Sequence, residues 1–386
     1  MRKSLLIAAM AGLAFVGCTE SDLDQSVSTQ QAISFSAPVV RPNTKAAQEV
    51  GNRYDTGLQF NVWGHWFVDN YTSFEDGELY IDEATAKYDV GQGNTWCPLN
   101  KNDYYYYWPK NGTITFSAYS PASEKMKAAT NVGASGLTIK DYVVDNTKPN
   151  NDMEDVLFSE RAYNKIASTG TNSPYSGVDI QFRHALSSIL FSAKVGKNFT
   201  YSGTQIRIKE IYLSNVASTA TFNQNLVDDN DETTTLPTTQ GHSTNEAAWT
   251  EPKNFVVYNV DNAEKILENG AEPWYFCTAD GSKPQVFGTV GNEYRYSDLI
   301  LIPQNLENVV LTIKYTIQST DSKELPQTYT KTFTDADEWI MGYRYIYNIS
   351  FDFDPITLAP MVSVFVDATE TGLNVPQQNP WDDEAW

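Results

Sequence analysis

Several stretches of the chain alternate hydrophobic and polar residues with a period of two. This alternation is typical of β-strands that bury one face, because successive side chains point to opposite faces of a sheet. The two longest stripes run from Val309 to Ile317 and from Tyr343 to Phe353. Shorter stripes comprise Ile33 and Phe35; Phe60, Val62 and Trp66; Val178, Ile180 and Phe182; and Ile189, Phe191, Ala193 and Val195. The pattern predicts half-buried strands of sandwich sheets.

Little of the chain has helical periodicity. Helical pattern is confined to short pieces such as Ala263 to Asn269, and turn-rich stretches such as Asn146 to Asn151 separate the stripes. Aromatic residues, which favour strands, make up 13% of the chain, and 23 residues are Tyr. The length of 386 residues is enough for two domains or three. We therefore predict an all-β protein.

The first residues have the pattern of a bacterial lipoprotein signal. Two basic residues precede an apolar run from Leu5 to Val16, which is too short to cross a hydrocarbon core of ~30 Å. Residues 1–17 are expected to be a signal peptide, and Cys18 the lipidated first residue of the mature chain. Residues 18–30 are polar and acidic, which predicts a tether. We expect the chain at the outer membrane, on the cell surface; the alternative is a secreted protein cleaved elsewhere.

The chain is strongly acidic. Its formal charge is −21 at pH 7, from 48 acidic and 27 basic residues. A field of this sign repels the phosphates of nucleic acids and anionic membrane surfaces. We therefore expect no nucleic-acid partner.

Residues suited to catalysis are scarce. The three histidines, His65, His184 and His242, form no His-Glu-x-x-His pair, and the chain has no G-x-S-x-G or P-loop motif. No two cysteines have the Cys-x-x-Cys spacing of a zinc site. We expect no enzymatic activity, no cofactor and no metal, with His184 a hydrogen-bonded residue at a sheet edge.

Two cysteines remain beyond Cys18. Cys97 and Cys277 lie 180 residues apart, so a disulfide between them would join two domains. An exported protein permits such a bond where the Cα atoms lie within ~7 Å of each other. We expect two buried free thiols, with a disulfide between Cys97 and Cys277 as the alternative.

The densest aromatic feature is the run Tyr104 to Tyr107, followed by Trp108 and Pro109. A strand whose rings alternate between the core and the outer face would explain it, with Pro109 ending the strand. Aromatic faces on an acidic surface protein also suit stacking on sugars. The second hypothesis for function is accordingly a surface lipoprotein that binds glycans through exposed Tyr and Trp.

The order of several motifs resembles that of the fimbrillins, the surface pilins of the type V pilus. The motifs span almost the whole chain, and their order is more specific than any one of them. After the lipoprotein signal they are Ile33-Ser-Phe35, Thr44-Lys45-Ala46, the Tyr-Trp108-Pro109 block leading into Ile114-Thr-Phe116-Ser-Ala118-Tyr119-Ser-Pro121, Phe182-Arg-His184-Ala-Leu186, and Gly342-Tyr343-Arg-Tyr345-Ile-Tyr347-Asn-Ile349.

The resemblance implies two β-sandwich domains of transthyretin-like, Greek-key topology. The N-terminal domain would comprise residues 31–195, including a removable first strand in residues 31–45. The C-terminal domain would comprise residues 196–354. Residues 355–386 would be a C-terminal extension that carries a candidate donor strand.

The resemblance also implies a structural subunit of a surface fimbria that serves cell adhesion. Such a subunit is exported as a lipoprotein, trimmed by a trypsin-like protease and polymerised with other pilus subunits by strand exchange. Its first strand, here Ile33 and Phe35, fills a groove that another subunit's strand later occupies. The donor side chains would be Val362, Val364 and Val366, which alternate in the tail.

The processing site departs from the family's pattern, in which Arg stands where this chain has Lys45, before Ala46. Arg41 lies nearby, but Pro42 follows it and would hinder a trypsin-like enzyme. The protease therefore accepts Lys45, cuts at Arg53, or never trims this subunit. An untrimmed subunit would stay lipid-bound as an anchor, so the stalk, anchor and tip roles remain open, as does the adhesion ligand.

Overall fold

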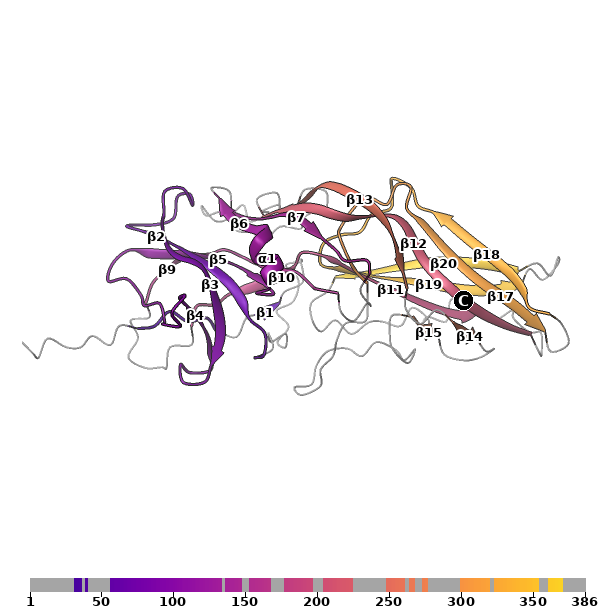
Figure 1. The fold of residues 1–386 in the computed structure, drawn as a ribbon, viewed down its shortest axis with the longest axis horizontal. Helices are drawn as coiled ribbons and strands as arrows, with labels where there is room; N and C mark the ends of the chain where they lie inside the picture. The colour runs from indigo at the N-terminus through magenta and orange to yellow at the C-terminus, as the bar shows by residue number, and fades with distance from the viewer. Residues whose placement is uncertain are drawn as a thin grey trace, which may run out of the picture.

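The computed structural model shows an elongated all-β molecule, with the N-terminal half on the left of Figure 1 and the C-terminal half on the right. The prediction of an all-β protein is confirmed, whereas the transthyretin-like connectivity stays a prediction. The residues that the structure describes are 31–36, 39–40, 56–133, 136–147, 153–167, 177–196, 204–224, 248–260, 264–267, 273–276, 299–319, 323–353 and 360–370.

A single curled sheet builds most of the N-terminal half. Its strand order is β1-β10-β8-β5-β2-β3-β4, and β9 also pairs with β5. The strands are β1 (Val39–Val40), β2 (Phe60–Phe67), β3 (Glu78–Asp89), β4 (Thr95–Leu99), β5 (Thr113–Ser120), β8 (Leu157–Ser159), β9 (Ala162–Lys165) and β10 (Gln181–His184). Phe60 of β2 and Phe182 of β10 meet edge to face, with ring centroids 5.3 Å apart, because the curl brings the two strands across one core.

A second sheet runs through both halves along one 20-residue strand, β12 (Thr204–Asn223). The start of β12 pairs with β17 and its end with β7. The other strands of this sheet are β6 (Thr130–Gly133), β7 (Gly136–Val143), β13 (Trp249–Asn259), β14 (Lys265–Leu267), β17 (Val310–Ser319) and β18 (Leu325–Thr332). Since β6 and β7 precede β10 in the chain, the second sheet ties the two halves together (Figure 1).

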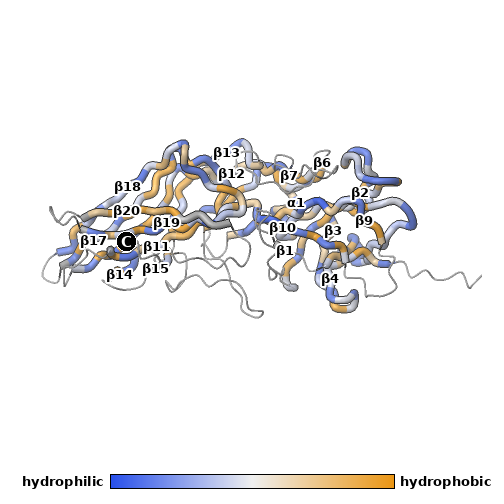
Figure 2. Tube along the Cα trace, turned by 180° about the vertical axis from the view of Figure 1, so that it is seen from behind, coloured by the Kyte–Doolittle hydropathy of each residue, from blue (hydrophilic) through white to orange (hydrophobic). Residues whose placement is uncertain are grey.

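A third sheet faces the second in the C-terminal half. It comprises β11 (Ser187–Val195), β15 (Trp274–Tyr275), β16 (Leu299–Leu301), β19 (Tyr343–Phe353) and β20 (Pro360–Glu370). Tyr315 of β17 and Phe351 of β19 contact each other between the sheets, with ring centroids 4.9 Å apart. Hydrophobic and hydrophilic positions alternate along many of the strands in Figure 2, as expected where one face lies in a core.

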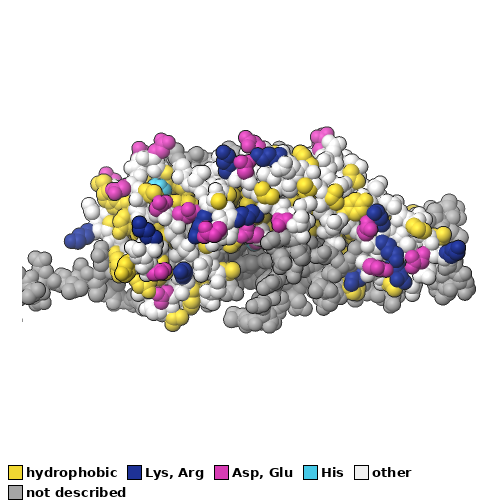
Figure 3. All heavy atoms as spheres, viewed as in Figure 1, with side chains coloured by type: hydrophobic (Ala, Val, Ile, Leu, Met, Phe, Trp, Pro, Cys, Tyr) yellow, Lys and Arg dark blue, Asp and Glu magenta, His cyan; other side chains and the backbone are white. Residues whose placement is uncertain are grey.

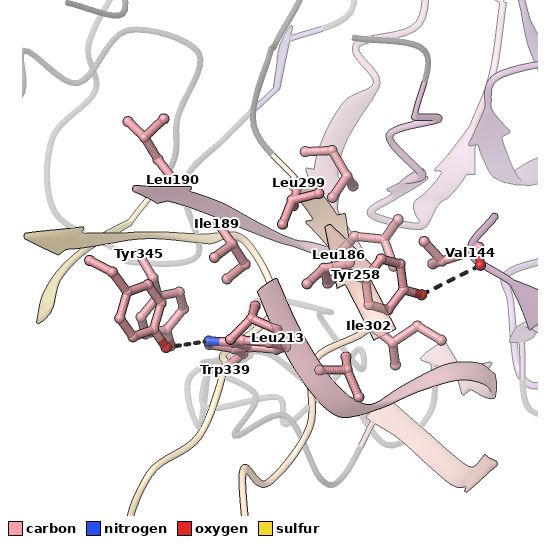
Figure 4. Packing of buried hydrophobic residues seen from close by; sticks show 14 of the residues in the cluster. Val144, Leu186, Ile189, Leu190, Leu213, Tyr258, Leu299, Ile302, Trp339 and Tyr345 are labelled. Atoms are coloured by element: carbon pink, nitrogen blue, oxygen red, sulfur yellow. Dashed lines mark hydrogen bonds between the residues drawn. The ribbon is translucent and has the colours of Figure 1, made fainter. Parts of the chain in front are cut away.

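Two main hydrophobic cores follow from this arrangement. The smaller core lies inside the curled sheet and includes Ile33 and Phe35. The larger core fills the C-terminal sandwich and continues to Tyr119 in the N-terminal half. In its interior the indole N–H of Trp339 donates a hydrogen bond to the Tyr347 hydroxyl at 2.8 Å (Figure 4). The large Trp339 ring is therefore buried without leaving its N–H group unpaired.

Two strands expected to be half-buried are instead buried on both faces. On β11 and β19 the residues between the predicted stripes, such as Leu190 and Ile346, are also buried. These two strands pair in parallel over eight residue pairs. Parallel strands are usually covered on both faces, and the alternating stripe in the sequence predicts burial of only one face.

The helical expectation for Ala263 to Asn269 was wrong. Lys265–Leu267 in that stretch is β14, which pairs with β12, so pairing with a neighbouring strand overrides the local pattern. The helix in the described part of the chain is α1 (Glu124–Ala129), where the Ser123 hydroxyl accepts a hydrogen bond from the Met126 amide at 3.2 Å. A Ser before an acidic first turn is the signal that predicts this helix start.

The expected domain division, 31–195 and 196–354, stays a proposal. The strand pairings bear on it, because β11 ends at Val195 but pairs only with β15, β16 and β19 in the described sheets. β11 therefore belongs with the C-terminal half. A boundary just before β11 would fit these pairings better than one after Val195.

The joint between the halves contains a buried hydrogen bond that can be tested. The indole N–H of Trp249 donates to the Ala185 carbonyl at 2.6 Å. We predict that Trp249→Phe, which leaves this carbonyl without its donor, lowers the free energy of unfolding by about 1–3 kcal/mol in urea titration. Trp274→Phe is the matched control, because the Trp274 N–H has no hydrogen-bond partner among the described residues. Equal losses in both variants would contradict the role of the bond.

Candidate assembly site

Residues 31–36 form an extended segment, called here the first strand, that hydrogen-bonds to β4 at one edge of the curled sheet and to the residues just before β10 near the other edge. On one side the Ile33 amide donates to the Tyr106 carbonyl at 2.8 Å, and the Phe35 amide donates to the Trp96 carbonyl at 2.8 Å. On the other side the Val178 amide donates to the Ser34 carbonyl at 2.7 Å. Trp96 lies in β4, at one end of the strand order, and Val178 leads into β10 near the other. The first strand thus closes the sheet on itself.

The side chains of the first strand fill a shaped groove. Ile33 and Phe35 are 0% exposed, and the Phe35 ring meets Phe116 edge to face at 5.2 Å. Full burial of such side chains stabilises the folded chain by about 1.5–3 kcal/mol each. Ser34 points to the opposite side and is 3% exposed. The groove therefore offers two large apolar pockets and, between them on the other face, room for a small side chain.

Gly177 allows one wall of the groove to approach the first strand. Its φ is +88°, and a Cβ there would lie 2.4 Å from the Phe35 carbonyl carbon and the Ser36 nitrogen. Only glycine tolerates both the conformation and the contact. The sequence signal for this feature is a glycine directly before the Val178 stripe, and hydrophobic periodicity does not reveal it.

The tyrosine run supplies part of the opposite wall. Tyr106 and Trp108 pack on the core of the curled sheet, whereas Tyr104 and Tyr107 are exposed. The expected alternation of rings holds only from Tyr106 to Trp108, because Tyr104 and Tyr106 differ in exposure, and the run forms isolated bridges instead of the predicted strand. The Tyr105 hydroxyl donates to the Asp89 carboxylate, and this bond raises the pKa of Tyr105 to about 12.

The candidate donor segment lies on its own domain. β20 pairs antiparallel with β19 along its whole length, with Val362 opposite Phe351, Val364 opposite Ile349 and Val366 opposite Tyr347. Val362 and Val364 are half-buried against the C-terminal core, but Val366 is 40% exposed. In the described sheets β20 is an edge strand, bound on one side only. An edge strand with half-buried side chains costs less to detach than a central one.

Several sequence-predicted residues lie outside the described part of the chain. They are Cys18, Lys45, Ala46 and Cys277, together with the signal peptide and the acidic tether. Cys97 is described, in β4, as a buried free thiol. Burial raises the pKa of Cys97 to about 11, so the thiol is protonated at neutral pH. Its pairing with Cys277 stays an untested alternative.

The remaining candidates for chemistry do not form a site. Nδ1 of the buried His184 lies 2.7 Å from an Asp155 carboxylate oxygen, so the histidine is hydrogen-bonded as expected. No group of three or more His, Cys, Asp or Glu in the described ranges could hold a metal ion. Within the same ranges, no helix has the length and apolar composition needed to cross a bilayer.

Several solved structures are similar to this chain to different degrees. The crystal structure of a fimbrial protein from Bacteroides vulgatus ATCC 8482 is similar with a TM-score of 0.52 and 15% identity, over 87% of this chain and 98% of that one. A putative cell adhesion protein from Bacteroides ovatus ATCC 8483 gives a TM-score of 0.45 and 14% identity, over 88% and 98%. The fimbrial anchor protein Mfa2 from Porphyromonas gingivalis gives 0.29 and 8%, over 89% and 99%. A search of the curated proteins found no match.

A family model settles the relationship that the motifs indicated. The model described as fimbrillin-like matches residues 44–364, which is most of the chain. The first of the similar crystal structures shares the fold, at an identity too low to show more. The chain therefore belongs to the fimbrillin-like family, a family of structural proteins of cell-surface fimbriae and not of enzymes.

Proposed function

We propose that the chain is a subunit that polymerises into a surface fimbria by strand exchange and serves cell adhesion. The observation that carries this proposal is the first strand, which hydrogen-bonds to β4 and to the residues just before β10 and fills the core of the curled sheet with Ile33 and Phe35. A cut at Lys45 would separate this segment from the strands β2 to β20 that follow it. The same cut would also release β1 (Val39–Val40) and its pairing with β10, whereas strands β2 to β10 would keep their pairings with one another, so removal would leave a groove instead of an unfolded domain.

The vacated groove would be a template for another strand. Tyr106, Trp96 and Val178 would lose the backbone hydrogen bonds that the first strand makes. The pockets of Ile33 and Phe35 would at the same time open to water. A row of backbone donors and acceptors beside apolar pockets favours strand addition, in which hydrogen bonds give affinity and pockets give specificity.

β20 is the segment of this chain best suited to fill that groove in a neighbour. Val362-Ser363-Val364 repeats the apolar-Ser-apolar order of Ile33-Ser34-Phe35. Shifting the donor by two residues would place Phe365 where Ser34 lies, and a phenyl ring at this position, which is 3% exposed and holds a small side chain, would force the neighbouring atoms to move. We therefore assign Val362 to the Ile33 pocket and Val364 to the Phe35 pocket, with Val366 following toward the joint.

The donor valines are smaller than the side chains that they would replace, so packing alone does not explain why the donor strand would displace the first strand. Valine fills less of a pocket than Ile33 or Phe35, so the donor would not displace an intact first strand on packing alone. Cleavage changes this comparison, because it converts the first strand into a separate peptide. The donor then remains tethered to a subunit and present at high effective concentration, whereas the peptide is diluted.

The proposal includes the expected route of export. The precursor would be held at the outer membrane through lipid on Cys18, and a trypsin-like protease would cut between Lys45 and Ala46. A subunit cut there would join other subunits, while an uncut one would remain an anchor. For the glycan-binding alternative, Tyr104 and Tyr107 are the exposed rings of that run, because Tyr106 and Trp108 pack into the core.

The processing site yields one prediction. Lys45→Ala should keep the protein monomeric and attached to the membrane, because the first strand continues to occupy the groove. The measurement is the heat-sensitive ladder of polymers on denaturing gels, with Arg53→Ala as the matched control. A normal ladder from Lys45→Ala together with its loss from Arg53→Ala would move the site to Arg53.

The donor strand yields a second prediction, centred on Ser363. Ser363 is exposed on its own domain but would be closely buried in the Ser34 position of a neighbour. Ser363→Glu should therefore leave the folded monomer intact and abolish the ladder, because a buried carboxylate without a partner costs several kcal/mol. Val364 is a poorer site for this substitution, since it also packs on its own core.

A matched control separates donation from general surface effects. Thr328→Glu places the same charge at an exposed position on β18, another edge strand, and should polymerise normally. Circular dichroism and thermal unfolding of the two monomers should agree with those of the unsubstituted chain. A full ladder from Ser363→Glu would show that β20 does not enter the groove in this register.

A further inference from the structure

We propose that the two ends of successive copies of this chain contact each other directly in the polymer. The inference rests on the proposed strand exchange and adds a second interface to it. The C pole is defined here as the end of the C-terminal half around Leu325, Ile266 and Arg207. The N pole is the end of the N-terminal half at the mouth of the first-strand groove, around Tyr80 and Tyr107.

The direction of the first strand places the mouth of the groove at the N pole. Phe35 pairs in parallel with Val178, and β1 pairs in parallel with β10. The chain from Val178 through β10 leads toward β11 and the joint between the halves (Figure 1). The first strand therefore runs the same way, with Gln31 at the end away from the joint.

The direction of β20 places its tether at the C pole. β19 runs in parallel with β11, from the joint outward, and β20 returns antiparallel to β19. Pro360, the first residue of β20, is thus beside the C pole and follows Phe353 after residues 354–359. A released β20 extends beyond the C pole. It enters a neighbour's groove from the N pole, in the same direction as the native strand.

The short tether limits the distance between the poles. When Val362 occupies the Ile33 pocket, Pro360 takes the place of Gln31 at the mouth of the groove. Phe353 is seven residues before Pro360, so the fully extended chain allows at most about 25 Å between them. Any slack shortens this distance further. A second copy of this chain is therefore the molecule that is held against the C pole.

The C pole carries exposed side chains suited to such a contact. Leu325 is 57% exposed, and Ile266 is also exposed. Beside them, Arg207 and Lys209 of β12 share Glu264 and Glu324 in ion pairs of 3.2–3.7 Å. Figure 3 shows basic and acidic side chains gathered at this end of the molecule. The pole thus combines apolar groups with a guanidinium group.

The N pole offers the complementary chemistry. Tyr107 is 40% exposed, and its carbonyl accepts a hydrogen bond from the Tyr80 hydroxyl at 2.6 Å. The Tyr80 and Tyr106 rings lie 6.3 Å apart, and Asp82 is near enough to help raise the pKa of Tyr106, after burial. Tyrosine rings pack well on Leu and Ile side chains and on guanidinium planes. Asp82 adds a charge opposite to that of Arg207.

Photo-crosslinking in assembled polymer tests the contact. Tyr107 is replaced by p-benzoylphenylalanine in the full chain, polymer is formed and irradiated, and cross-linked peptides are identified by mass spectrometry. We expect links from Tyr107 to peptides that contain Leu325 or residues 264–267 of a neighbour. The same replacement at Val143, which is exposed near the joint, is the control and should give no link to these peptides.

A longer tether tests the cause of the contact. In this variant, a Gly-Ser insert is placed within residues 354–359 and doubles the length of this segment. The variant should still form the ladder of polymers but should lose the cross-link. If the chain of native length polymerises but Tyr107 gives no cross-link to the C pole, the pole contact is refuted and strand exchange is not. If the unsubstituted chain forms no polymer, strand exchange is refuted, and the pole contact with it.

Discussion

The two-sided hydrogen bonding of residues 31–36 is the constraint on which the account depends. The segment bonds to Tyr106 and Trp96 on one side and to Val178 on the other, so six residues close a sheet whose other strands come from residues 39–184. The same residues fill its core with Ile33 and Phe35. Because this segment precedes Lys45, the proposed cut would release it and leave its groove open. Meanwhile β12, shared by both halves, provides a continuous link to the domain that carries β20.

Much of the fold could be predicted because burial imposes a period of two on a strand. The stripes at Val309 to Ile317 and Tyr343 to Phe353 correspond to β17 and β19 within two residues at each end. The same signal fails where burial is two-sided, as at Leu190, or where a strand is very short, as in β14. Hydrophobic periodicity also does not predict which strands pair with each other. The extension of β12 into both halves and the placement of β11 with β19 depend on long-range contacts that no local window contains.

The candidate site could be predicted in part. Ile33 and Phe35 were identified from alternation and from the resemblance to fimbrillins, and both are fully buried. The closely buried Ser34 position and the approach of Gly177 were not, because each is defined by backbone from a distant part of the chain. The valines of the tail were identified, but their docking on β19 was not. Periodicity shows which side chains of β20 share a face, but it does not show which strand β20 pairs with.

Hydrogen exchange at the rims of the groove tests the central claim most directly. The Trp96 amide donates to the Phe35 carbonyl at 3.0 Å, and the Val178 amide donates to the Ser34 carbonyl at 2.7 Å. Exchange at both amides should be slow in the precursor, fast in the trimmed monomer and slow again in the polymer, because a donor strand restores both bonds. Amides that stay fast in the polymer, or that never lose protection after trimming, would contradict strand exchange at this groove.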